Sequence, residues 1–190
     1  MRSPHKSVGA IFLTLASLLF LVSCSNQING DKFSRTDLMF ADMMIPHHQQ
    51  AIQMSELAIA ISSNSEIISL ARRIKTAQAP EIEQMKEWED SGDPSHMGHE
   101  MMEDFEESST GMMGMLDEGE LSELERAKGT EFDRLFLKGM IAHHEGAIGM
   151  AQMVDDSKNK EAAELGKAII KAQKAEILEM QTLLDSLPKN

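Results

Sequence analysis

The segment FADMMIPHHQQAIQM, residues 40–54, decides the fold because it returns 96 residues later as FLKGMIAHHEGAIGM, residues 136–150. The two copies share Phe, Met-Ile, His-His, Ala-Ile and Met at aligned positions. Further along, the offset becomes 95, as in Gln78 and Gln173 or Glu81 and Glu176, so one residue is missing from a turn of the second copy. Each half of the chain is therefore predicted to be a pair of helices joined by a tight turn.

Capping signals mark where these helices begin. Ser34 with Asp37 and Thr130 with Asp133 resemble capping boxes at the start of the first helix in each half. Asn64 or Ser65 and Asn159 are candidate caps for the two second helices. The expected helices span about 35–62, 65–90, 131–156 and 160–186.

Residues 91–129, rich in Gly, Ser, Met and acidic side chains, separate the two hairpins. A connection of this length can cross from one end of a bundle to the other. We therefore expect an all-α, ferritin-like four-helix bundle made of two repeated helical hairpins joined by a long crossover. The predicted domain covers residues 34–188, with repeat halves 34–90 and 130–188.

The first residues form a targeting segment. Arg2 and Lys6 precede an apolar run that is too short to span a membrane, and the run ends in Leu-Val-Ser-Cys at residues 21–24, which resembles a bacterial lipobox. We predict a lipoprotein signal peptide at 1–23, lipid on Cys24 and a tether at 24–33. The protein would then be exported and anchored to a bacterial membrane, facing the periplasm or the cell exterior. A plain secretory signal with an incidental Cys is the alternative.

Composition excludes several classes of function. The chain carries 31 acidic and 18 basic side chains, a net charge of −13, which argues against nucleic acid as a partner. Its single Cys excludes an internal disulfide framework and any metal site built from four thiolates.

The repeated His-His pairs are the strongest candidates for chemistry. Around the helix axis His47 lies in the middle of the apolar face, and His143 does so in the second copy, with Met side chains within one turn. Buried imidazoles cost free energy unless something binds them, although a lone buried His is more often satisfied by an ordinary hydrogen bond. The predicted ligands are Met44, His47, His48, Met54, Met140, His143, His144 and Met150. Among them His48 and His144 are second ligands or gates.

The ligand types indicate which ion would bind. Imidazole and thioether without thiolate suit Cu(I), with Ag(I) as a second soft ion, better than Zn, Mg or Ca. Di-iron bundles need a Glu-x-x-His motif, and the chain contains none. In the crossover, His96 and His99 stand among Met residues and are predicted to be part of a capture loop, with a solvated loop as the alternative.

The two motifs resemble the DUF 305 family. Met44-x-x-His-His-x-x-Ala-Ile-x-Met54 and the partner pattern Gln78-x-x-Glu-Ile-x-x-Met85 carry the resemblance, and both recur in the second half. It implies a ferritin-like fold, export, and kinship with periplasmic copper-binding proteins of the CopM type that are linked to copper tolerance.

We therefore expect a copper-binding protein, not an enzyme, that sequesters or transfers Cu(I). Two alternatives stay open. A ferritin-like, metal-dependent oxidoreductase would need an open coordination position and turnover. A non-metal interaction module would use His and Met as core and its acidic surface to recognise a partner.

Overall fold

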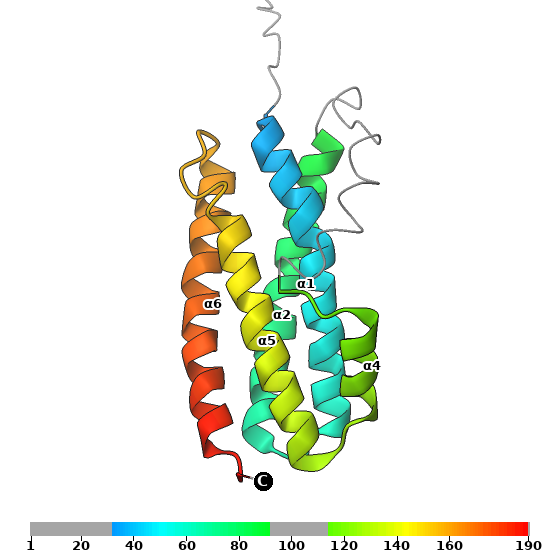
Figure 1. Ribbon diagram of the computed structural model, residues 1–190. Helices are drawn as coiled ribbons and strands as arrows, with labels where there is room; N and C mark the ends of the chain where they lie inside the picture. Colours follow the sequence, from blue (N-terminus) through cyan, green and yellow to red (C-terminus); the bar gives the residue numbers. More distant parts are fainter. Residues whose placement is uncertain (1–31, 92–113, 190) are drawn as a thin grey trace, which may run out of the picture.

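The computed structural model describes residues 32–91 and 114–189, and all regular elements in these ranges are helices. Helix α1 (Arg35–Ile61) pairs with α2 (Ser65–Ser91), and α5 (Gly129–Ala151) pairs with α6 (Lys160–Ser186). In Figure 1, α1 and α6 descend while α2 and α5 rise, so α1 and α5 are antiparallel where the two hairpins meet. The expected all-α bundle of two hairpins is confirmed.

Three of the four helix starts follow the predicted capping chemistry. Ser34 and Asp37 form a full capping box, with Asp37 N–H donating to Ser34 Oγ over 3.2 Å. Asn64 Oδ1 accepts from Glu66 N–H, and Asn159 Oδ1 accepts from Glu161 N–H and Ala162 N–H in the first turn of α6.

The prediction that Thr130 caps α5 is wrong. The helix begins at Gly129, and its N-cap residue, Lys128, makes no side-chain capping bond. Asp133 is engaged elsewhere, because its Oδ1 accepts a 2.6 Å hydrogen bond from Ser62 Oγ in the turn of the first hairpin. This buried bond joins the two hairpins at one end of the bundle.

The prediction that this helix runs to residue 156 is also wrong, since α5 ends at Ala151. Met153 N–H and Val154 N–H bond to carbonyls only three residues back, which is the tightened pattern of a helix end. Asp155 and Asp156 follow, and negative charge is unfavourable at a helix C-terminus.

The predicted crossover contains a helix that the sequence analysis did not assign. Helix α4 (Glu118–Arg126) starts with a capping box between Asp117 and Glu120 and buries Leu124. It lies beside the lower half of α1 in Figure 1 and also contacts α5.

Gly114, the first described residue of the predicted crossover after residue 91, lies close to the backbone of α5. Gly114 has φ +73°, and a Cβ there would lie 2.0 Å from the carbonyl oxygen of Ala142. Two residues later, Leu116 is held by Gln50 of α1, whose amide donates to Leu116 O and accepts from Leu116 N–H, both over 2.8 Å. The end of the crossover is thus fixed beside His143.

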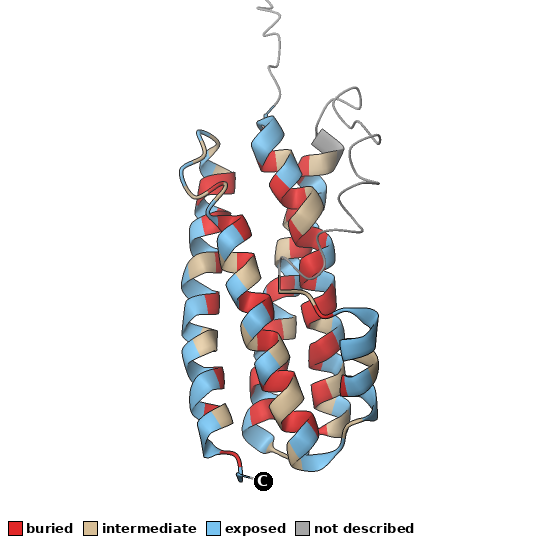
Figure 2. Cartoon of the chain, in the orientation of Figure 1, coloured by how far each residue is buried: buried red, intermediate tan, exposed pale blue. Residues whose placement is uncertain are grey.

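Buried side chains line the inner sides of the helices, while the outer sides of α4 and α6 are exposed (Figure 2). Within the described ranges, none of the helices combines the length and the apolar character that crossing a membrane requires.

Candidate metal centre

The His-His motifs meet at the centre of the bundle. Because α1 and α5 run antiparallel and each carries the motif near its middle, His47 and His143 face each other, with ring centroids 3.7 Å apart and ring planes at 37°. Both of these side chains are fully buried, as are His48 and His144. The chain therefore places four imidazoles in one apolar interior.

The outer histidine of each pair contacts a carboxylate on the partner helix of its own hairpin. His48 Nε2 lies 2.8 Å from Glu81 Oε2 on α2, and His144 Nε2 lies 2.7 Å from Glu176 Oε2 on α6. The two contacts are repeat equivalents. Each carboxylate is partly exposed, so it links a buried ring to the surface of the bundle.

Several polar atoms of the motif histidines, and of the glutamines one helical turn before Glu81 and Glu176, are buried without a hydrogen-bond partner in the protein. They are both ring nitrogens of His143, Nδ1 of His48 and of His144, both amide atoms of Gln78 and Oε1 of Gln173. An unsatisfied buried polar atom costs about 1–3 kcal/mol, so a native core rarely keeps many of them. Their concentration around the motif residues identifies this region as the place where a ligand would be stabilising.

The electrostatics of the centre favour a neutral His143 ring. Burial lowers the pKa of His143 well below its ordinary value, and the neighbouring His47, His144 and His48 lower it further, while the backbone of His47 raises it weakly. A neutral imidazole keeps a lone pair, which is the form that binds a metal ion.

The predicted thioether ligands are all buried, but they belong to two separate groups. Met54 and Met140 pack in one core cluster together with Met180, and Met44 and Met150 pack in the other together with Met85. Three thioethers thus belong to each of the two core clusters, in keeping with the sequence repeat.

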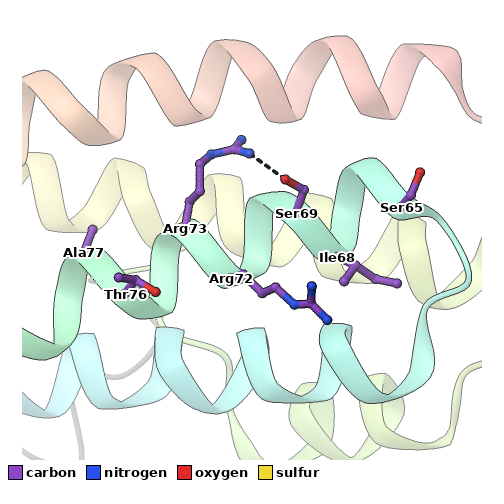
Figure 3. A pocket seen from close by; sticks show the side chains of 7 residues that line it. All are labelled: Ser65, Ile68, Ser69, Arg72, Arg73, Thr76 and Ala77. Carbon is purple, nitrogen blue, oxygen red and sulfur yellow. Dashed lines mark hydrogen bonds between the residues drawn. The ribbon is translucent and has the colours of Figure 1, made fainter.

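In the described part of the chain, no group of three or more His, Cys, Asp or Glu side chains is placed to hold a metal ion. A surface hollow on α2, shown in Figure 3, is lined by residues such as Ser69, Arg72 and Arg73 and includes none of the predicted ligands.

Three predicted site residues lie outside the described residues: Cys24, with its signal peptide, and the crossover pair His96 and His99. Glu81, Glu176 and Gln50 were not among the functional residues predicted from the sequence. The recurrence of Gln-x-x-Glu-Ile-x-x-Met was the available signal for the two glutamates.

Comparison with known proteins gives the family and the fold that this chain shares with them. A family model described as a domain of unknown function, DUF305, matches residues 37–184. A search of curated proteins finds no match. A DUF305 fragment from Deinococcus radiodurans is 28% identical, with a TM-score of 0.67 over 81% of this chain and 98% of its own. A DUF305 protein from Streptomyces coelicolor, named as a candidate secreted protein, is 27% identical, with a TM-score of 0.66 over 79% and 92%.

Further solved structures are of CopM. Its Cu(II)-bound form is 35% identical to this chain, with a TM-score of 0.62 over 78% of this chain and 95% of CopM. CopM has also been solved in Cu(I)-bound and Ag-bound forms. The family match covers most of the chain and the structural matches cover nearly all of each relative. The chain therefore belongs to the DUF305 family.

Proposed function

We propose that this protein binds Cu(I) in the bundle centre, with Ag(I) as an alternative ion, and sequesters or transfers it outside the cytoplasm. The observation that carries the proposal is the contact between the buried rings of His47 and His143, whose centroids lie 3.7 Å apart. Both ring nitrogens of His143 lack a hydrogen-bond partner. His47 and His143 would be inner ligands, together with the thioethers of the two groups. His48 and His144 would complete the centre.

The chemistry of the donors supports a soft monovalent ion. Neutral imidazole and thioether donors carry no charge to offset that of a bound ion. A buried site made of them therefore costs less electrostatic free energy with a monovalent ion than with a divalent one. Related CopM structures hold Cu(I), Cu(II) and Ag. That kinship supports copper binding in this chain.

Export and anchoring form part of the same proposal. The apolar run before Cys24 and the lipobox-like sequence at residues 21–24 support a lipid anchor on that residue. The negative net charge of the chain would concentrate cations near the surface. A Cys24→Ser variant should move from the detergent phase to the aqueous phase in a partition assay, and equal partitioning would contradict the anchor.

Binding should be measured as metal content and as thermal stability of the tether-to-domain fragment, residues 25–190. A ligand that binds only the folded state stabilises it, by about 2.7 kcal/mol at a hundredfold excess over Kd. We expect Cu(I), supplied under reducing conditions, or Ag(I) to raise the melting temperature of the wild-type fragment. Zn(II) should raise it far less.

Two double variants distinguish metal binding at the bundle centre from metal binding at the crossover histidines. The double variant His47→Ala with His143→Ala should lose most of the stabilisation by Ag(I). The double variant His96→Ala with His99→Ala removes the same number of imidazoles and should keep it. An unchanged shift in the first variant would contradict the assignment of the centre. Steady-state turnover in an oxidase assay with Cu(I) or Fe(II) would contradict a binding role in favour of an enzyme.

A further inference from the structure

We propose that Glu81 and Glu176 are positioning residues that fix the rings of His48 and His144, so that Nδ1 of each ring is presented to the bound ion. This inference rests on the proposed function and assigns residues to it that are not themselves ligands. Its basis is a pair of contacts, 2.8 Å and 2.7 Å long, made by residues at equivalent places in the two repeats.

The hydrogen-bond chemistry fixes which ring nitrogen is free. An ionised carboxylate can only accept, so the Nε2 atom facing it must carry the hydrogen and donate. In a neutral imidazole the lone pair then lies on Nδ1. The structure leaves that atom buried and without a hydrogen-bond partner in both His48 and His144.

A purely structural pairing does not account for this arrangement. A buried polar atom in a structural core is nearly always satisfied, yet the same atom is orphaned in both repeats. One turn before the glutamates, Gln78 and Gln173 are also buried with unpartnered amide atoms. Each repeat therefore holds a glutamate carboxylate that contacts Nε2 of a buried histidine ring, while Nδ1 of the same ring has no hydrogen-bond partner.

A histidine with one nitrogen on a carboxylate and the other nitrogen free is typical of metal ligands in proteins. A ligating histidine commonly donates its second N–H to a carboxylate, which orients the ring and raises its basicity as a donor. The carboxylates here are placed for this role, since Glu81 and Glu176 are about one-fifth exposed while the rings they hold are fully buried. Each glutamate also supplies a negative charge near a site whose neutral donors bring none.

The test compares apo-protein spectra with Ag(I) affinity. In wild-type apo protein, long-range ¹H–¹⁵N spectra of the imidazoles should show His48 and His144 as Nε2–H tautomers. The double variant Glu81→Ala with Glu176→Ala should show mixed tautomers at both rings. Its Ag(I) affinity should fall about 10- to 100-fold, the usual effect of losing such a partner.

Matched controls lie on the same two helices. Glu83 pairs with Lys86 and Glu179 pairs with Arg73 on the surface, so the double variant Glu83→Ala with Glu179→Ala removes two carboxylates without touching either histidine. It should keep wild-type tautomers and affinity. Circular dichroism and urea unfolding establish that each variant is folded.

The conservative double variant Glu81→Gln with Glu176→Gln keeps a hydrogen-bonding side chain and serves if the alanine variant does not fold. Its amides can donate or accept, so we expect mixed tautomers and an intermediate loss of affinity, about 3- to 10-fold.

Wild-type tautomers and affinity in the folded glutamate variants would overturn this inference and leave the proposed function intact. Failure of the wild-type protein to bind Cu(I) or Ag(I) would overturn the proposed function and this inference with it.

Discussion

The contact between Gln50 and Leu116 gives the sharpest stability prediction. The Gln50 amide satisfies both backbone polar groups of Leu116 over 2.8 Å, and both residues are only 8% exposed. A Gln50→Ala variant leaves a buried N–H and a buried C=O without partners. Each orphaned group costs about 1–3 kcal/mol, so we expect a loss of about 2–4 kcal/mol, the lower part of the summed range because water can reach Leu116 in part.

Urea unfolding followed by circular dichroism measures this loss as a decrease in the free energy of unfolding. Gln49 is the matched control, because it is the neighbouring residue of the same type and is exposed. Gln49→Ala should change stability by less than about 0.5 kcal/mol. A Gln50→Ala variant as stable as the Gln49→Ala control would refute the reasoning that this amide fixes the end of the crossover.

Three further predictions follow from the same structure. Gly114→Ala should destabilise by more than about 2 kcal/mol in urea unfolding, because a Cβ would lie 2.0 Å from Ala142 O at a φ of +73°, and a smaller loss would show that the crossover can move away. Ser62→Ala should cost about 1–3 kcal/mol in thermal unfolding, since it leaves the buried Asp133 carboxylate without its 2.6 Å donor; an unchanged melting temperature would contradict this. Burial lowers the pKa of His143 in the folded state, so below about pH 6.5 the unfolded chain binds more protons, and stability of the metal-free protein should fall as pH decreases, by up to about 1.4 kcal/mol per pH unit. His143→Gln should flatten that slope in unfolding curves measured between pH 7.5 and 5.5, and an unaltered slope would assign the effect to other groups.

The sequence predicted the bundle because its decisive signals are local and occur twice. The two copies of the His-His motif, the recurring Gln and Glu positions after them and the capping residues predicted four helices. The apolar face around His47, repeated around His143, predicted the burial of both rings. The end of α5 was misplaced by five residues, since apolar Met153 and Val154 continue the helical spacing after the hydrogen bonding has changed. The spacing of apolar residues predicts which face of a helix is buried, but it does not predict the residue at which the helix ends.

The parts that were missed depend on contacts between segments far apart in the chain. Gln50 has an exposed Gln beside it and a partner 66 residues away, and the equivalent position in the second half is Gly146, so repetition gave no hint of its role. Glu81 and Glu176 were recognised from the sequence only as equivalent positions of the two repeats. Their histidines lie on the other helix of each hairpin, so their pairing is set by helix packing.

The central claim is tested most directly by locating the ion. Crystals of the silver- or copper-loaded protein, measured at wavelengths that give anomalous scattering from the metal, should show a peak at the interface of α1 and α5, within coordination distance of imidazole nitrogens of His47 and His143. Anomalous peaks confined to the surface, with the buried histidines unchanged from the metal-free protein, would contradict the account.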